Sequence, residues 1–418
     1  MEIIENYVEK SSALSSGSSQ ESNEVASLGK YAKSATTCED LDNEKHEQDR
    51  QIRYRTLRAE RYKLQSVARG WLYNEGVLLG LKYPSNYHRT AQCLFLPNGQ
   101  GVGLSKSNTT QRAFYTGLQT CGSVWSCPVC TAKIQEKRRA EIGKAVNYFY
   151  ENKSQAVLLT FTIKHKIFQS LENNQELFLT ALRKLRSGNQ WTLFKKRYGF
   201  KGLIRSLEHT YGSNGWHPHT HELWFCDTDI DEKTFINFIK NRWLKICKKV
   251  GIVASSKEEK SFLEHSLDVK FNCRASDYLA KQDKSSHWGV DSEVAKGARK
   301  SNHPFAFLNN ENDEKSRRLF LEYVKATKGK AQIFWSRGLK DLIGVEEKTD
   351  EEIAEEENDL IFLLKILSEE QWKIIVTLKK RSELLDIAET RDIDFINQYI
   401  EDLKRSLPGE TTTPRGLV

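Results

Sequence analysis

Residues 201–225, KGLIRSLEHTYGSNGWHPHTHELWF, decide the predicted fold because two strand-like segments flank the turn-forming stretch YGSNG. Gly and Asn favour tight turns, so this region predicts a β-hairpin over residues 201–226. We expect the two strands to reverse around Ser213 and Asn214.

The second strand of this hairpin carries three histidines in five residues, His217, His219 and His221. Alternate side chains of a strand share one face, so the three imidazoles are expected to point the same way. The expected register places Glu208 across from His219 to His221. Two imidazoles beside a carboxylate suit Mg²⁺ or Mn²⁺ bound with a phosphate, and would also hold Zn²⁺. The alternative is a set of structural surface histidines.

Helical and strand patterns alternate around the hairpin. Predicted helices cover residues 51–67, 132–152, 173–187 and 231–250, and predicted strands cover residues 156–163 and 266–271. This order predicts an α+β fold in which helices pack on one side of an antiparallel sheet.

Composition divides the chain into four predicted segments. They are a disordered leader (1–50), a helix with a cysteine-containing segment (51–131), a central α+β domain (132–344), and an acidic linker with a helical tail (345–418). Within the tail, residues 360–405 have Leu and Ile at helical spacing.

The basic charge of this 418-residue chain is concentrated in its middle. The net charge is +8 overall, but residues 51–340 hold 49 basic and 25 acidic side chains, net +24. Such a surface attracts polyanions such as nucleic acids, although lysine-rich surfaces also serve solubility. The mean hydropathy is -0.62, and the sequence shows neither a membrane span nor a signal peptide, which predicts a cytoplasmic chain.

Four cysteines could form a structural zinc site. Cys121, Cys127 and Cys130 lie in CGSVWSCPVC, and Cys93 lies upstream. A Cys-x-x-Cys pair fits one edge of a tetrahedral metal site, and the other two thiolates could complete it. Ordinary reduced cysteines are the alternative.

Tyr278 and Lys281 form a second candidate pair in SDYLAKQ (276–282). Helix positions three apart are neighbours, so the phenol and the ammonium would project together. A nearby cation and a metal-polarised phosphate can make a phenol an effective nucleophile. Tyr and Lys at this spacing also occur in many helices without a catalytic role.

The order of these motifs resembles the plasmid rolling-circle replication initiators of the His-hydrophobic-His endonuclease superfamily. The resemblance rests on LLTFTIKH (158–165), WHPHTHEL (216–223) and YLAK (278–281). It extends to CGSVWSCPVC and to KGKAQIFWSRGLKDLIG (328–344), and so covers about residues 90–345.

The resemblance implies a metal-dependent, site-specific DNA endonuclease and strand transferase that nicks one strand of the plasmid double-strand origin. Tyr278 would be the nucleophile, leaving a 5′-phosphotyrosine bond and a 3′-hydroxyl primer. His219 and His221 would be metal ligands and Lys281 would position metal or phosphate, while His217 matches a frequent histidine of the motif. The resemblance also implies Mg²⁺ or Mn²⁺ as cofactor and a host helicase and polymerase as partners. The helical tail could mediate self-association or contact a host helicase.

The sequence departs from the family pattern at one position. Some members have a glutamate one helical turn before the tyrosine, where this chain has Arg274. The nearest acid, Asp277, would face about 100° away from Tyr278 on a helix. The residue that activates water at termination is therefore not identified.

Three other functions remain open at this point. A relaxase or transposase of the same superfamily would share the chemistry and act on another DNA element. A non-catalytic, zinc-containing DNA-binding regulator would use the histidines structurally. A small-molecule hydrolase is disfavoured by the basic middle segment and the tyrosine helix.

Overall fold

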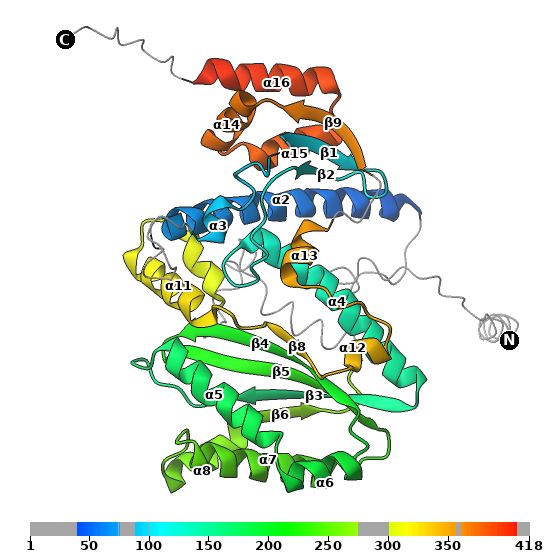
Figure 1. Ribbon diagram of the computed structural model, residues 1–418, viewed down its shortest axis with the longest axis vertical. Coiled ribbons are helices and arrows are strands. Elements are labelled where there is room, and N and C mark those ends of the chain that lie inside the picture. Colours follow the sequence, from blue (N-terminus) through cyan, green and yellow to red (C-terminus); the bar gives the residue numbers. More distant parts are fainter. Residues whose placement is uncertain are drawn as a thin grey trace, which may run out of the picture. The chain divides into compact units, whose positions relative to one another are not determined.

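The structure is a computed structural model that describes residues 40–73, 75, 88–99, 101–274, 301–356 and 361–407 (Figure 1). The side chains of residues 40–48 and 301–302 are not described. Of the predicted leader, residues 1–39 lie outside the described residues. Helix α2 (Asp40–Tyr73) begins ten residues before the predicted end of the leader at residue 50.

The largest element is a six-stranded antiparallel sheet, which confirms the predicted α+β class. Its strand order is β6-β3-β5-β4-β7, and β8 pairs with the same strand, β4. The strands are β3 (Ser154–Thr162), β4 (Gly202–Gly212), β5 (Gly215–Asp227), β6 (Leu267–Lys270), β7 (Ser301–Asn302) and β8 (Ile333–Trp335).

The predicted hairpin is formed by β4 and β5, which reverse through Ser213 and Asn214. Register runs from Gly202 opposite Phe225 to Gly212 opposite Gly215. It places Glu208 directly opposite His219.

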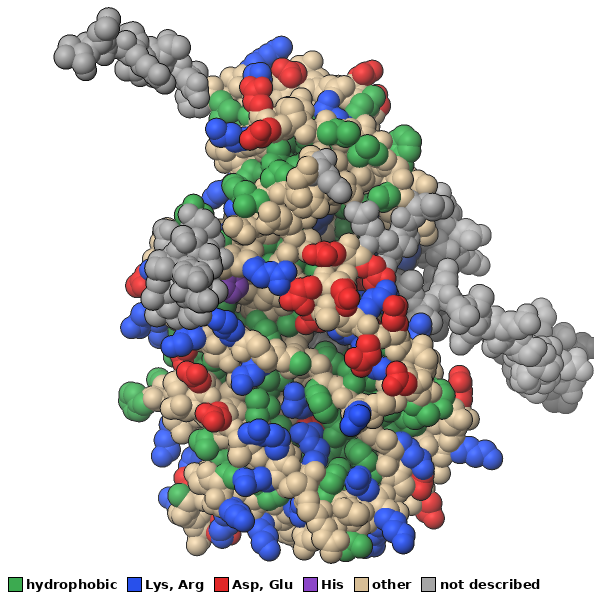
Figure 2. Space-filling view, viewed as in Figure 1, with side chains coloured by type: hydrophobic (Ala, Val, Ile, Leu, Met, Phe, Trp, Pro, Cys, Tyr) green, Lys and Arg blue, Asp and Glu red, His purple; other side chains and the backbone are tan. Residues whose placement is uncertain are grey.

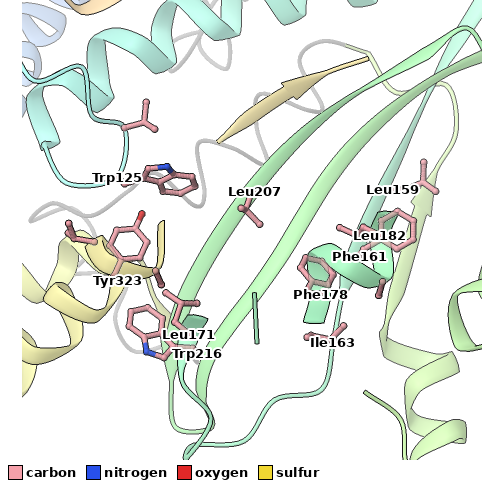
Figure 3. Close-up of a cluster of buried hydrophobic side chains, with 14 of the residues drawn as sticks. Trp125, Leu159, Phe161, Ile163, Leu171, Phe178, Leu182, Leu207, Trp216 and Tyr323 are labelled. Atoms are coloured by element: carbon pink, nitrogen blue, oxygen red, sulfur yellow. The ribbon is translucent and has the colours of Figure 1, made fainter. Parts of the chain in front are cut away.

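Helices α5 (Leu171–Leu185), α6 (Asn189–Arg197) and α7 (Glu232–Lys249) cover one face of this sheet (Figure 1). Amphipathic spacing in the helices and alternation in the strands bring their apolar side chains together. Figure 3 shows Phe161 of β3 close to Phe178 and Leu182 of α5. Large aromatic rings therefore make up much of this core.

Helix α4 (Pro128–Glu151) covers one end of the opposite face. Phe149 of α4 stacks on Phe225 of β5 with ring centroids 4.1 Å apart, and Ile142 packs in the same cluster. Strand alternation puts His217, His219 and His221 on this same face, farther along β5 than the part covered by α4. On this face, one end of the sheet is thus part of the core, and the other end carries polar side chains.

A second, three-stranded antiparallel sheet has the order β2-β1-β9. It consists of β1 (Val102–Ser107), β2 (Ala113–Thr116) and β9 (Ile361–Leu367). Its core is shared with α14 (Glu369–Thr377), α15 (Arg381–Thr390) and α16 (Ile393–Ser406).

The sequence pattern predicted helix throughout residues 360–405, and it is wrong for residues 361–367, which form β9. This strand pairs with β1 from Leu367 opposite Val102 to Ile361 opposite Ser107. The small sheet therefore joins residues from the second and the fourth predicted segments. The four segment boundaries remain a proposal.

Shorter helices connect these parts. They are α3 (Arg89–Gln92), α8 (Ser256–His265), the 3₁₀ helix η2 (Pro304–Asn309), α11 (Glu314–Thr327), α12 (Leu339–Leu342) and α13 (Asp350–Glu355). The predicted acidic linker contains α13, which begins with a capping box between Thr349 and Glu352. Lys133 of α4 donates to the backbone oxygen of Ala354 in this helix. Within the described part of the chain, we find no helix with the length and apolar character that crossing a membrane requires.

Candidate metal-binding site and cysteine cluster

Strands β4 and β5 bring Glu208, His219 and His221 together. One potential ligand atom from each lies within 4.8 Å of the other two. The Nε2 atoms of His219 and His221 lie 3.3 and 3.7 Å from the same carboxylate oxygen, Oε2 of Glu208. All three side chains are mostly buried, so the cluster is a preformed nitrogen and oxygen donor set.

Hydrogen bonds to the outer atoms orient these three side chains. The Nδ1–H of His219 donates to the backbone oxygen of His217 at 3.3 Å, which leaves the Nε2 lone pair facing Glu208. Nδ1 of His221 lies 3.0 Å from Oγ1 of Thr160, and the hydroxyl of Ser206 donates to Oε1 of Glu208 at 3.2 Å. Metal-bound histidines commonly use their second ring nitrogen in this way. The donor set therefore fits a divalent metal ion.

His217 lies beside this cluster, and none of its atoms belongs to the group of converging ligand atoms. Its ring centroid lies 5.2 Å from that of His219 and 4.7 Å from that of His165, with which it stacks. Burial, followed by the proximity of His219 and His165, lowers the pKa of His217 to about 3. The neutral ring is therefore suited to packing.

The sequence argument missed three residues near the cluster: Thr160, Ser206 and His303. Thr160 and Ser206 lie on strands opposite His221, and the period-two pattern could have placed them on the histidine face. Burial lowers the pKa of His303 to about 4, and Glu208 opposes this effect. Nothing in the local sequence around His303 signals its approach to the hairpin.

The predicted cysteine set also converges. The Sγ atoms of Cys93, Cys121, Cys127 and Cys130 all lie within 4.8 Å of one another. Neighbouring pairs are separated by 3.5 Å, 3.6 Å and 3.7 Å. A tetrahedral zinc ion with Zn–S bonds of about 2.3 Å requires sulfur separations of about 3.8 Å. The thiols therefore already have the spacing of a four-thiolate site.

Two arginines supply positive charge next to these thiols. Arg381 is only 3% exposed, and its guanidinium donates to the neutral oxygens of Gln65, Leu94 and Ser66. Burial lowers the pKa of Arg381, and Cys93 and Cys127 oppose that shift. Burial likewise lowers the pKa of Arg69 to about 10. A buried guanidinium needs an anion nearby, and thiolates at a metal would provide it.

The state of Cys127 agrees with this electrostatic setting. Although burial acts to raise it, hydrogen bonds from Cys121, Cys130 and Cys93 hold the pKa of Cys127 well below its ordinary value. Hydrogen bonds among the thiols raise the pKa of Cys93 and of Cys130 well above the ordinary value, so Cys127 is the thiol that most readily ionises. A thiolate is the form that binds a metal. The cluster is thus a candidate structural metal site.

The predicted nucleophile lies outside the described residues. Tyr278, Lys281 and Asp277 all fall within residues 275–300, which the structure does not describe. Arg274 is the last described residue before them and follows Cys273, whose N–H donates to the backbone oxygen of Ala156 in β3. The catalytic roles of Tyr278 and Lys281 therefore remain predictions.

Comparison with known proteins assigns a family to the chain. Residues 114–379 match the family described as "Replication protein". The chain belongs to this family. The match covers well over half of the chain and includes the Glu208, His219 and His221 cluster. The predicted resemblance to replication initiators is confirmed at the level of the family.

Two curated relatives of this replication protein come from streptomycetes. "Protein rep" of Streptomyces lividans is 32% identical over 134 residues, which cover 26% of this chain and 29% of the relative. "Neomycin resistance protein" of Streptomyces cyanogenus is 30% identical over 132 residues, which cover 26% of this chain and 30% of the relative. The chain thus spans less than a third of either relative. No solved structure matches the replication protein.

Charge is unevenly distributed over the described surface of the replication protein. Figure 2 shows Lys and Arg side chains gathered over the large sheet and its helices, and Asp and Glu side chains gathered around α13. The last turn of α6 contributes three consecutive basic residues, Lys195, Lys196 and Arg197, all exposed. The part that carries the candidate metal site is therefore also a basic part.

Proposed function

We propose that this replication protein is a plasmid replication initiator that binds the double-strand origin and nicks one DNA strand. The observation that carries the proposal is the convergence of Glu208, His219 and His221 within the region matched by the family. In the proposed step, the Tyr278 hydroxyl loses its proton and its oxygen bonds to the scissile phosphorus. The bond from phosphorus to the 3′ oxygen breaks, and that oxygen takes up a proton. The products are a 5′-phosphotyrosine and a 3′-hydroxyl primer.

Each residue of the cluster has a specific part in this proposal. Glu208, His219 and His221 hold Mg²⁺ or Mn²⁺, and His217 packs beside them outside the ligand set. A bound divalent ion polarises the scissile phosphate. Thr160 keeps the His221 ring oriented, and Lys281 positions the phosphate. Orientation by rigid strands matters because positioning contributes much of the rate of phosphoryl transfer.

We propose that the cysteine cluster holds a structural zinc ion. The sulfur spacing of 3.5 to 3.7 Å, the buried Arg381 and the half-buried Arg69 support this assignment. Four thiolates and Zn²⁺ leave two negative charges, which Arg69 and Arg381 would balance. Zinc with four cysteine ligands is a common structural site.

DNA is the proposed partner because phosphate contacts by Lys and Arg dominate nucleic-acid affinity. The +24 charge of residues 51–340 supplies such contacts. A host helicase and polymerase would then act at the nick, and the protein would work in the cytoplasm. The acidic C-terminal segment could contact the helicase or a second copy of the chain.

The test is to incubate the protein with labelled fragments of its own replicon in the presence of Mn²⁺ and to map the nick and the attached 5′ end. Tyr278→Phe should abolish the covalent adduct and retain duplex binding. Tyr148→Phe, a tyrosine of α4, is the matched control and should form the adduct normally. An unchanged adduct in Tyr278→Phe would exclude this nucleophile.

The same experiment separates the alternative functions. Cleavage confined to a DNA element other than the replication origin would indicate a relaxase or transposase. Binding without cleavage, unaffected by chelation of Mn²⁺, would indicate a non-catalytic zinc-containing DNA-binding regulator.

A further inference from the structure

The turn that follows β3 exposes two large apolar side chains. Ile167 is 51% exposed and Phe168 is 96% exposed. They are the central residues of a β-turn in which the N–H of Gln169 donates to the backbone oxygen of Lys166 at 3.0 Å. Gly, Pro, Asn and Asp usually occupy such positions. Positions that break such a local sequence rule are often functional.

The turn is held firmly in this conformation. The Lys166 N–H also donates to Oε1 of Gln169 at 2.8 Å, which closes the turn from the other side. The Cα of Ile167 lies so close to Gly215 that a Cβ added to this glycine would be 2.9 Å away. Gly215 also has a φ of +88°, which favours glycine. The turn is thus anchored on the β4–β5 hairpin while Ile167 and Phe168 point into solvent.

A row of histidine rings links this turn to the candidate metal site. His165, directly before the turn, stacks on His217 at 4.7 Å, and His217 lies 5.2 Å from the proposed ligand His219. Thr162, the last residue of β3, is opposite His219 in the register. The apolar turn therefore lies at the border of the site.

Two lysines come just before the two apolar residues in the chain. Lys164 and Lys166 precede them, and both are exposed. Lys164 forms an ion pair with Glu258 at 2.9 Å. An exposed aromatic ring among cations matches single-stranded DNA, in which unpaired bases offer faces for stacking and phosphates offer negative charge. In duplex DNA the base faces are already stacked on neighbouring bases and are not free to stack on a protein side chain.

We propose that the Ile167–Phe168 turn is a stacking site for an unpaired base of single-stranded DNA that enters the Glu208, His219 and His221 site. This inference rests on the proposed nicking function, and it names the form of DNA that the site receives. Phe168 provides the ring, Ile167 extends the apolar surface, and Lys166 meets the neighbouring phosphate.

The experiment measures binding of the full-length protein to a single-stranded oligonucleotide and to the matching duplex, both labelled with fluorescein and containing 2-aminopurine. Phe168→Ser should weaken single-strand binding about tenfold or more, because base stacking on an aromatic ring contributes that much. Duplex binding should stay unchanged, and the quenching of 2-aminopurine should be lost. Phe168→Tyr should behave as the wild type. Leu193→Ser is the matched control, since Leu193 of α6 is also exposed (58%).

The outcomes separate this inference from the proposed function. Tyr278-dependent cleavage by the wild type, combined with normal single-strand binding by Phe168→Ser, would overturn the stacking site alone. Selective loss of single-strand binding in Phe168→Ser, with no cleavage by the wild type, would support the stacking site and overturn the nicking function. If Phe168→Ser instead abolished binding to anionic lipid vesicles and kept normal single-strand binding, the turn would be a membrane contact and the inference would be wrong.

Discussion

Replacing Thr160 by valine tests whether the outer hydrogen bonds of the histidine cluster serve metal binding. Thr160 lies on β3, directly opposite His221 in the register, and its Oγ1 is 3.0 Å from Nδ1 of His221. Valine keeps the branched shape and the strand preference of threonine but cannot make this hydrogen bond. The substitution therefore removes the orienting contact and leaves the three proposed ligands in place.

The expected effect is a 10- to 100-fold loss of Mn²⁺ affinity, the usual result of removing an outer-shell partner of a metal-bound histidine. This loss equals about 1.4–2.7 kcal/mol of binding free energy. A purely structural role of the same hydrogen bond would instead lower the free energy of unfolding by about 1 kcal/mol and leave the metal affinity unchanged.

Electron paramagnetic resonance of free Mn²⁺ during a titration measures the affinity directly, without DNA. Thr162→Val is the matched control because Thr162 lies opposite His219, whose Nδ1 is hydrogen-bonded to the backbone oxygen of His217 instead. Thr160→Ser keeps a hydroxyl and should restore most of the affinity. Equal Mn²⁺ affinities for the wild type, Thr160→Val and Thr162→Val would refute the assignment.

Three further predictions concern burial and charge. Burial lowers the pKa of His209 to about 3. As the pH falls below about 6.5, the imidazole of His209 is therefore protonated in the unfolded chain and stays neutral in the folded one. The free energy of unfolding should therefore fall by about 2 kcal/mol on this account between pH 7 and pH 5, and urea titrations of His209→Phe should lack that part of the decrease. Cys130→Ser should reduce the zinc content measured by mass spectrometry from one equivalent to none, whereas Cys226→Ala, outside the cluster, should keep it. Arg381→Met should cost about 3–5 kcal/mol of unfolding free energy in the zinc-loaded protein, because it breaks a buried charge pair. The same substitution should lower the unfolding free energy clearly less after zinc has been chelated and the thiols kept reduced. An equal loss in both states would contradict the role of Arg381 as a counter-charge to the zinc site.

The hairpin and its cluster could be predicted from sequence because strand geometry is local. A two-residue turn at Ser213 and Asn214 fixes the pairing, and the period of two then fixes which side chains share a face. Glu208 follows from this register, although it lies 11 residues from His219. The same reasoning applied to β3 would have identified Thr160 beside His221.

Strand β9 could not be predicted because its stability comes from a distant partner. Six of the seven residues of IFLLKIL are apolar, with Lys365 the exception, so the segment fits a helix or a strand equally well by periodicity. The choice is made by β1, whose Val102 pairs with Leu367 across more than 250 residues of sequence. The position of Arg381 could not be predicted either, because its approach to Cys93 depends on how α15 packs on the cysteine segment.

Trp125 shows how the two candidate metal sites depend on one fold. It lies between Cys121 and Cys127, two of the proposed zinc ligands, and its indole N–H donates to the backbone oxygen of Lys330 at 2.7 Å. Its ring packs against His209 with centroids 5.5 Å apart (Figure 3 shows the indole). His209 directly follows Glu208 on β4, so the cysteine segment supports the strand that carries the carboxylate. Because packed interiors transmit strain, we expect a disordered cysteine loop to disturb the geometry of the Glu208 site.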